Sequence, residues 1–313
     1  MVLFEAGLMK FTVVLFAVIA VLLPLFAVAQ FDNGRVGFTI AFEGLESDLS
    51  ILTTAIMPGQ RLHITTSADA AANMGQLSKQ GNGWIWVAPA KPERAELDFT
   101  IGAESIRLNV FVLTPFKNGE TESLNGYRVG HYATTLFKGL ETYSVPQGFI
   151  DFAKGPEDLK ISPHFTLKQF LCKQQPGHDP TYLLVRTAML IKLEALLDAA
   201  NAKGWRADSF YVMSGFRTPF YNRSIGNDTS SSRHLYGGAA DIWLDNDGDG
   251  QMDDLNQDGK INKDDARALA ALAGTLADKG GRNWPAGGIG VYGANSAHGP
   301  FLHIDARGYR ARW

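Results

Sequence analysis

The chain has 313 residues, of which 45% are hydrophobic and 19% are charged, so it has enough apolar material for a sizeable core and, by its length, for two domains. Its formal net charge is −3 and the sequence shows no basic stripe, so we predict no nucleic-acid partner. The single cysteine, Cys172, cannot form a disulfide within the chain, and the cysteine content therefore neither requires nor excludes export.

The first 29 residues are typical of a secretory signal. Lys10 gives a short positive flank, an apolar run follows from Phe11 that only Pro24 interrupts, and "AVAQ" ends in an A-x-A site. We expect cleavage after Ala29, which places the remaining chain in the periplasm or cell envelope with no stable membrane insertion. The alternative is a retained anchor, because the apolar run is close to the length that spans a bilayer.

Short alternating or apolar runs follow, and they predict a small all-β domain over residues 30–116. The runs are "VGFTIAFEG", "RLHITTS", "GWIWVAP", "ELDFTIG" and "IRLNVFVL". Gly, Asp and Pro turns separate them, as in a small antiparallel, Ig-like sandwich. Residues 117–157 are rich in glycine and aromatic residues, and we interpret them as a connector that can lie against the second domain.

Helical and strand patterns are mixed in residues 158–313, which predicts an α+β domain. "TYLLVRTAMLIKLEALLDAANAKG" has apolar residues at helical spacing and ends at a Lys-Gly stop, and "KDDARALAALAGTLADKGG" is a second helix with a glycine stop. "SFYVMSGFRTPFYN" predicts a strand that enters a polar loop, and "GAADIWL" and "GPFLHIDAR" predict further strands. The fold class predicted for the whole chain is therefore α+β, with an all-β domain first.

Three residues of this second domain have the pattern of a zinc site. His234 and Asp241 bracket two glycines in "SRHLYGGAAD", and these glycines allow the chain to bring the histidine back beside the strand residue. Zinc needs ligands, commonly imidazole and carboxylate, that converge from separate backbone segments. The segment "FLHIDAR" supplies a third ligand, and strand alternation puts His303 on one face with Asp305 and Arg307.

The pattern S-x-H-x-x-G-x-A-x-D at residues 232–241, followed by His303, resembles the metal signature of the zinc D-alanyl-D-alanine carboxypeptidase family. That family includes peptidoglycan endopeptidases and shares its core with lysostaphin-type enzymes and the hedgehog signalling domain. "SGFRTPFYN" is similar to its S-G-Y-R-T motif, and "SPHFTLKQFLC" and "HIDARGYRARW" resemble the two ends of its compact single-domain subgroup. The resemblance covers residues 158–313.

The resemblance implies a hedgehog/D-Ala-D-Ala-peptidase-like fold with one catalytic Zn²⁺ on His234, Asp241 and His303. It also implies that Arg217 lies near the substrate carboxylate or the developing oxyanion. The implied activity is hydrolysis of peptide bonds in peptidoglycan stem peptides or cross-links, and the sequence leaves carboxypeptidase and endopeptidase action both open. Ser232, Tyr221 and Asn222 are predicted to contact an extended peptide substrate.

The general base is the point at which the sequence departs from much of that family. A base must accept the proton of the attacking water, and the family's glutamate before the last histidine is missing, since no glutamate follows Glu194. His298, five residues before His303, ranks first as the base. Asp305 is the second candidate and ranks first as support for a histidine or an arginine. The missing glutamate leaves an alternative function open, which is a catalytically inactive metal-containing module that binds the cell wall.

An acidic run over residues 245–265 predicts one or two structural Ca²⁺ ions. Residues 254–265 fit a 12-residue calcium loop whose closing aspartate resembles the dockerin loop, and a less complete loop that overlaps it begins at Asp245. The run holds eight aspartates and two lysines, a density that repels itself unless a cation compensates, and the alternative is a solvated acidic loop. We predict that Ca²⁺ stiffens this insertion and so holds the nearby zinc ligand. The predicted calcium-binding residues are Asp245, Asp247, Asp249, Gln251, Asp254, Asn256, Asp258, Lys260 and Asp265.

Overall fold

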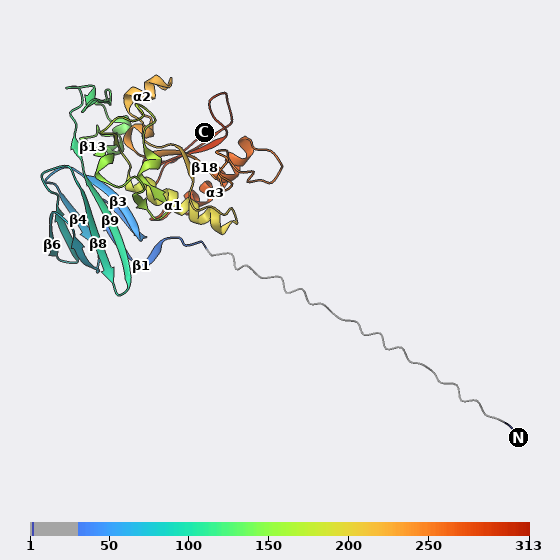
Figure 1. The fold of residues 1–313 in the computed structure, drawn as a ribbon, viewed down its shortest axis with the longest axis horizontal. Helices are drawn as coiled ribbons and strands as arrows, with labels where there is room; N and C mark the ends of the chain where they lie inside the picture. The colour runs from blue at the N-terminus through green and yellow to red at the C-terminus, as the bar shows by residue number, and fades with distance from the viewer. Residues whose placement is uncertain (1, 3–30) are drawn as a thin grey trace. The chain divides into compact units, whose positions relative to one another are not determined.

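The computed structural model of the protein describes residue 2 and residues 31–313 (Figure 1). The signal predicted for residues 1–29 therefore lies, apart from residue 2, outside the described residues. In the described part of the chain, no helix combines the length and the apolar character needed to cross a membrane. Residues 31–313 form one unit by their internal contacts.

Two β-sheets are built from residues 35–112. The first has the strand order β2-β1-β4-β7-β6 and the second has the order β3-β9-β8-β5. All pairs within them are antiparallel except β3 with β9, which are parallel, so the fully antiparallel arrangement expected from the sequence does not hold at this edge. The strands are β1 (Arg35–Phe42), β2 (Leu45–Leu49), β3 (Ile51–Ile56), β4 (Arg61–Thr65), β5 (Asp69–Ala72), β6 (Gln76–Gln80), β7 (Gly83–Val87), β8 (Arg94–Ile101) and β9 (Glu104–Val112).

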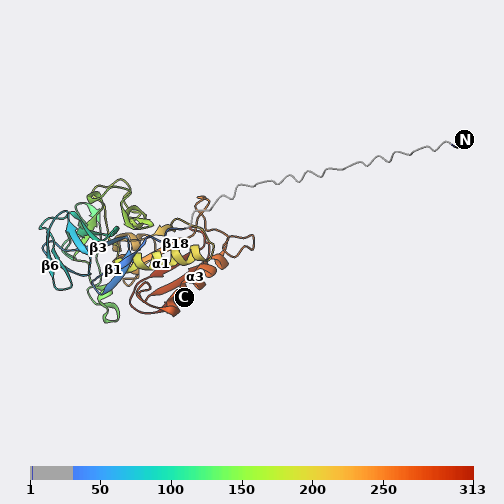
Figure 2. The ribbon, with the colours of Figure 1, turned by 90° about the horizontal axis from the view of Figure 1, so that it is seen from below.

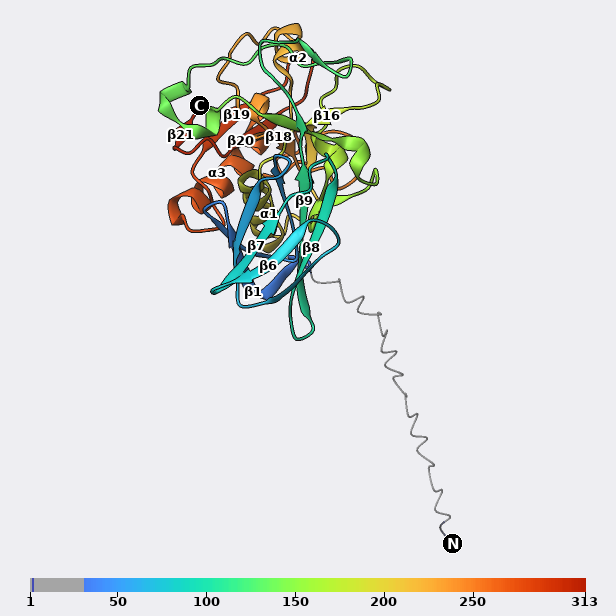
Figure 3. The same ribbon diagram turned by 90° about the vertical axis from the view of Figure 1, so that its left-hand side faces the viewer.

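The two sheets share one hydrophobic core, and Figure 3 looks onto these strands. Strand β4 shows how the sequence achieves this, because Leu62 and Ile64 are buried while their neighbours are exposed. Trp86 of the first sheet and Phe99 of the second belong to the same buried cluster. The sheets therefore pack face to face as a sandwich.

The segment at residues 117–157 packs into the core of the second part of the chain. Tyr127, Tyr143 and Phe149 are fully or almost fully buried in one cluster with the helices that follow. The short elements of this region and the next are β10 (Thr114–Pro115), β11 (Ser123–Leu124), β12 (Tyr127–Arg128), η1 (Phe137–Gly139), η2 (Glu141–Tyr143), β13 (Gly148–Asp151), η3 (Phe152–Lys154), β14 (Lys160–Ser162), β15 (Phe165–Thr166), η4 (Leu167–Phe170) and β16 (Tyr182–Leu183).

A five-stranded sheet with the order β17-β18-β20-β19-β21 forms the centre of the second part. Helix α3 packs against β19 and β20 and contacts α1, and Figure 2 shows both helices beside this sheet. The described chain is thus α+β, as predicted. The elements are α1 (Thr187–Ala202), β17 (Tyr211–Ser214), α2 (Pro219–Ser224), η5 (Arg233–Tyr236), β18 (Ala239–Trp243), α3 (Lys263–Lys279), β19 (Gly288–Tyr292), β20 (Phe301–Asp305) and β21 (Ala311–Arg312).

Helix α1 begins later than the apolar spacing predicts. The spacing starts at Thr181, whereas the helix starts at Thr187. Tyr182 and Leu183 instead form β16 and pair with β13. Backbone groups that are bonded to a neighbouring strand are not free for a helical turn, so the tertiary pairing overrides the local pattern.

Helix α1 also fixes the sandwich to the second part. The Thr187 hydroxyl donates a hydrogen bond of 2.6 Å to the carbonyl of Thr53 in β3, and both residues are buried. Ile191, one turn further along α1, packs into the sandwich core. The same helix therefore contributes to both hydrophobic cores.

Candidate metal centre

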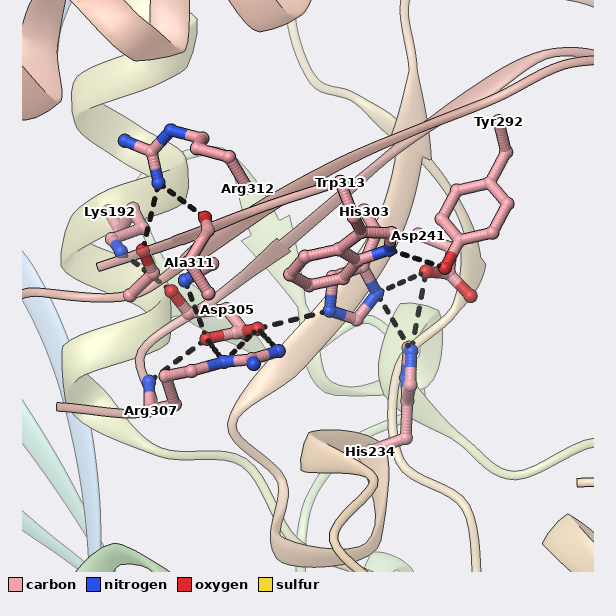
Figure 4. Close-up of polar contacts among 12 residues, drawn as sticks. Lys192, His234, Asp241, Tyr292, His303, Asp305, Arg307, Ala311, Arg312 and Trp313 are labelled. Atoms are coloured by element: carbon pink, nitrogen blue, oxygen red, sulfur yellow. Dashed lines mark hydrogen bonds and ion pairs between the residues drawn. The ribbon is translucent and has the colours of Figure 1, made fainter. Parts of the chain in front are cut away.

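The three residues predicted to bind zinc lie together and are buried. His234 Nε2 is 3.3 Å from Asp241 Oδ1 and 3.3 Å from His303 Nδ1, and His303 Nδ1 is 2.8 Å from Asp241 Oδ1 (Figure 4). Ligand atoms around a tetrahedral zinc ion lie about 3.3 Å apart, because zinc bonds to nitrogen and oxygen are about 2.0–2.1 Å long. The spacing of these three atoms fits a zinc ion.

Strand register and one glycine bring the three side chains together. Asp241 of β18 lies directly opposite His303 of β20, so the two side chains are cross-strand neighbours on one face. His234 lies in η5, which leads into β18 through Gly237 at φ +64°. A Cβ atom at this position would lie 2.6 Å from the backbone of Leu184, so the return of the histidine requires glycine.

The outer nitrogen of each histidine is held by a protein acceptor. His234 Nδ1 donates to the carbonyl of Gly215 at 2.7 Å, and His303 Nε2 donates to Asp305 Oδ2 at 3.2 Å. These bonds fix the orientation of both rings, so that His234 Nε2 and His303 Nδ1 face the common centre. A metal ion can therefore bind His234 and His303 without rotation of either imidazole ring.

Arg217 lies beside the same centre. Its Nη2 donates to Asp241 Oδ2 at 2.6 Å, and its Nε donates to Ser214 Oγ at 2.7 Å. The bond to Oδ2 leaves Asp241 Oδ1 as the oxygen that faces the two histidines. Arg217 was predicted to face the substrate, and the structure shows that it also orients a predicted metal ligand, a role that the sequence analysis missed.

The electrostatics of the cluster match these contacts. Burial lowers the pKa of His234. Burial also lowers the pKa of His303, but hydrogen bonds to Asp241 and Asp305 outweigh it and raise that pKa to about 8. Burial alone would raise the pKa of Asp241, yet its contacts with the two histidines hold it well below the usual range. Without a metal, Asp241 is therefore ionised and His303 carries a proton that a metal ion has to displace.

The three residues open onto a groove of about 450 Å³. Four of the polar residues that line the groove come from the loop after α2, and we call them the polar wall. Four aromatic residues that line it come from β19, β20 and the segments that follow these strands, and we call them the aromatic wall. The polar wall consists of Asn227, Thr229, Ser231 and Ser232, and the aromatic wall consists of Tyr292, His298, Phe301 and Trp313.

The predicted substrate-contacting residues separate into two groups. Ser232 lines the groove, whereas Tyr221 and Asn222 do not. Asn222 is buried, and its side-chain amide donates to the carbonyl of Asn227 at 2.5 Å. Its position supports the loop that carries the polar wall.

His298, the first-ranked general base, lines the groove. Its Nδ1 donates to the carbonyl of Gly299 at 2.8 Å, and its Nε2 accepts from the side-chain amide of Asn295 at 2.8 Å. Its ring packs edge-on against Phe301, with centroids 4.8 Å apart. The basic nitrogen is thus Nε2, and Asn295 has to release it before it can accept a proton.

Asp305, the second candidate, is completely buried and is not among the residues that line the groove. Besides its bond to His303, its carboxylate accepts from the backbone N–H of Gly288 at 2.9 Å and from Arg307 Nε at 2.9 Å. Burial raises the pKa of Asp305, but its contacts with His303 and Arg307 hold it well below the usual range. This environment suits an anionic support for His303, the role in which it ranked first.

Lys192 is a residue that the sequence analysis missed. It lies in α1, is fully buried, and its Nζ donates to the carbonyl of Asp305 at 2.6 Å. Burial lowers its pKa to about 7. A lysine in the apolar run "MLIKLEALL" is a sequence signal for such a contact, because lysine is rarely buried unless it is paired.

The acidic run forms loops between β18 and α3. In the first loop, one carboxylate oxygen each of Asp245, Asp247 and Asp253 lie within 4.8 Å of one another. Asp253 was not among the predicted ligands. In the second loop, the carboxylate of Asp254 accepts from the backbone N–H groups of Asp258 and Gly259, at 3.2 and 2.8 Å. The carboxylates thus make bonds mainly within their own loops.

Asp265, predicted to close the second calcium loop, is buried at the start of α3. Its Oδ1 accepts from the backbone N–H of Leu255 at 2.9 Å and of Asn256 at 3.3 Å. Its Oδ2 accepts from Asn262 N at 2.8 Å, as one half of a capping box. The structure thus gives Asp265 a helix-capping role, and calcium binding by the run stays a prediction.

Residues 163–262 match the model of a protein family described as Peptidase M15. The matched range contains His234 and Asp241, while His303 lies beyond it. No curated protein matches the chain. The match supports the zinc D-Ala-D-Ala carboxypeptidase family that the motifs resemble, and it agrees with a His-Asp-His cluster that can hold a metal.

Proposed function

We propose that this protein is an exported zinc metallopeptidase that hydrolyses peptide bonds in peptidoglycan stem peptides or their cross-links. The observation that carries the proposal is the convergence of His234 Nε2, Asp241 Oδ1 and His303 Nδ1 at the spacing of a tetrahedral zinc site. A groove of about 450 Å³ beside these atoms is open to a ligand. The family match and the apolar N-terminal run support the peptidase and its export, respectively.

Zinc bound at this cluster supplies a water of lowered pKa and polarises the scissile carbonyl. The chain holds the ligands in place through Gly215, Asp305 and Arg217, so that the site is organised before substrate arrives. Arg217 also lines the groove, where its positive charge can stabilise negative charge that develops on the substrate.

His298 is the residue of the groove that we propose as general base. It accepts the proton of the attacking water on Nε2 and passes it to the leaving amine. For this step, the amide of Asn295 turns away from Nε2, while the bond from Nδ1 to Gly299 keeps the ring and its tautomer in place. Asp305 stays behind His303 and maintains its orientation.

The proposal is tested on protein that begins at Gln30, with elemental analysis and digestion of purified muropeptides. We expect about one zinc per chain, as a single catalytic site requires. Loss of a terminal residue from linear stem peptides identifies a carboxypeptidase, and separation of cross-linked dimers identifies an endopeptidase. Zinc without cleavage of either substrate contradicts the hydrolase and favours the inactive binding module.

The general base is tested with His298→Ala. We expect kcat to fall by about 10²–10⁴-fold with zinc retained, which is the range for loss of a general base. His131→Ala is the matched control, because His131 is an exposed histidine that pairs with Glu122 and is not among the residues that line the groove. An unchanged kcat in His298→Ala would assign the proton transfer to another group.

A further inference from the structure

Trp313 is held against the candidate metal centre at several points (Figure 4). Its backbone continues β21 along β19. The N–H of Trp313 donates to the carbonyl of Ile289 at 3.3 Å, and its carbonyl accepts from the N–H of Val291 at 3.0 Å. Its indole Nε1 donates to the hydroxyl of Tyr292 at 2.7 Å. These contacts hold the indole against β19 and Tyr292.

Two glycines of β19 make room for this indole. Gly288 and Gly290 alternate along the strand and so share one face. A Cβ atom at Gly288 would lie 2.9 Å from the indole of Trp313, and one at Gly290 would lie 2.4 Å from it. Neither glycine has a positive φ, so these positions require glycine for space and not for backbone conformation. The strand thus gives the ring a flat floor.

The indole also contacts the metal-binding cluster and the groove. Its centroid lies 5.3 Å from that of His303 with the rings at 46°, and the guanidinium of Arg307 lies 4.8 Å from the indole. Trp313 remains 47% exposed and Tyr292 remains 37% exposed, and both line the groove. A rigid, half-exposed aromatic surface is therefore adjacent to a predicted zinc ligand.

Such a surface favours an apolar group of the ligand, because burial of apolar area against it removes that area from water. The ordering cost is small, since the ring is already fixed. The polar wall of the same groove offers amide and hydroxyl groups, which suit the hydrogen-bonding groups of a peptide backbone. The aromatic wall therefore suits an apolar side chain of a peptide, and the polar wall suits its backbone.

We propose that Trp313 is a substrate-contacting, specificity-determining residue whose indole, together with Tyr292, binds an apolar side chain of a substrate residue next to the scissile bond. This inference rests on the proposed function and names the part of the site that selects an apolar residue in a peptide substrate. The competing explanation is that Trp313 only closes the edge of the sheet and covers His303.

The test compares Trp313→Ala and Trp313→Phe in the zinc-loaded protein, with muropeptides released by a muramidase as substrates. We expect Trp313→Ala to raise KM on the order of tenfold while kcat, zinc content and Tm change little, and Trp313→Phe to retain a KM within about threefold of the wild type. Tyr211→Ala is the matched control, because Tyr211 is 42% exposed and stacked on Trp243, and it is not among the residues that line the groove. An unchanged KM in Trp313→Ala, or an equal rise in Tyr211→Ala, overturns the proposal.

A second measurement remains decisive where Trp313→Ala fails to fold or loses zinc. Binding of muropeptides should change the tryptophan fluorescence of the wild type, and Trp313→Phe should lose most of that change. A change that persists in Trp313→Phe overturns the proposal. Wild-type protein that binds with this response and cleaves nothing retains the Trp313 contact and loses only the hydrolase, whereas protein that neither binds nor cleaves muropeptides loses both.

Discussion

The two candidate cation sites lie close together along the chain and are built in different ways. Asp241 belongs to a buried cluster, and the acidic run begins four residues later on the surface. In the buried cluster, Gly215, Asp305 and Arg217 occupy the outward-facing atoms, so that one atom of each ligand is left for a metal. In the acidic run, carboxylates accept hydrogen bonds from the backbone of their own loops.

The two sites therefore obtain their specificity for a cation in different ways. Residues that hydrogen-bond to the ligands of a zinc site fix the orientation of those ligands, and in this way they affect the affinity for the metal. A calcium loop, in contrast, has all its protein ligands at fixed positions within one short loop, and it can be recognised from their spacing. The buried cluster therefore depends on tertiary contacts, whereas the acidic run depends on local sequence. Substitutions at the buried cluster should therefore have larger effects than substitutions in the acidic run.

Removal of a buried ligand should have the largest effect. We expect His303→Ala to lose zinc and to reduce kcat/KM by about a thousandfold or more, because several kcal/mol of transition-state stabilisation depend on the metal. Elemental analysis and muropeptide digestion measure the two effects. His131→Ala, an exposed histidine, should change neither. Full activity without zinc in His303→Ala would exclude the proposed mechanism.

Removal of the carboxylate behind His303 should have an intermediate effect. We expect Asp305→Ala to weaken zinc binding by about 10–100-fold, because the imidazole loses the acceptor that sets its tautomer and orientation. Competition with a chromophoric chelator measures the affinity. Asp278→Ala is the matched control, since Asp278 pairs with Arg310 on the surface and both side chains are exposed. Equal affinities in the two variants would contradict a positioning role for Asp305.

Zinc binding at the buried cluster should depend on pH. In the metal-free protein, burial lowers the pKa of His303 but its bonds to Asp241 and Asp305 raise it to about 8, above the value of about 6.5 for an unfolded chain. The stability that this proton contributes is present below about pH 6.5 and is lost as the pH rises through about 8. Zinc must displace the proton, so its affinity should rise by up to about tenfold per pH unit towards pH 8 and then level off.

Zinc titrations between pH 6 and 9 measure this dependence, and chemical denaturation of the metal-free protein measures the stability. His303→Ala is the reference for stability and should show a flatter profile between pH 6.5 and 8. The acidic run contains no histidine, so a response of the protein to Ca²⁺ should not change in this window. A zinc affinity that is constant from pH 6 to 8 would contradict the assigned proton.

Changes in the acidic run should have the smallest effect. If the run binds Ca²⁺, the ion should raise Tm by about 2–4 °C for each kcal/mol of binding free energy, and Asp254→Asn combined with Asp258→Asn should abolish the increase. Thermal unfolding with Ca²⁺ and with a calcium chelator measures it, with Asp278→Asn as the control for a lost surface charge. A Tm that does not respond to Ca²⁺ in the wild type would leave the run as a solvated loop.

Much of the fold could be predicted from the sequence, because the signals were local. Alternation predicted β4, the segment "GAADIWL" predicted β18, and the helical pattern with its glycine stop predicted α3. The start of α1 could not be predicted in this way, because the pairing of β16 with β13 replaces a helical turn. The contribution of residues 117–157 to the second core was equally inaccessible, since it depends on where distant side chains pack.

For the candidate site, the sequence shows which residue types are available and which of them share a strand face. It placed His303 and Asp305 on one side of a strand and supplied the glycine that returns His234 towards Asp241. Both inferences follow from the period of a strand and the conformational freedom of glycine, which are properties of a few neighbouring residues.

How these residues contact one another depends on the tertiary structure. Asp241 and His303 are 62 positions apart and meet through the pairing of β18 with β20. The same sheet places Trp313 beside His303, while the packing of α1 brings Lys192 to the carbonyl of Asp305. Register and packing between distant segments set which atom of each side chain faces the centre, and no local pattern in the sequence encodes that direction.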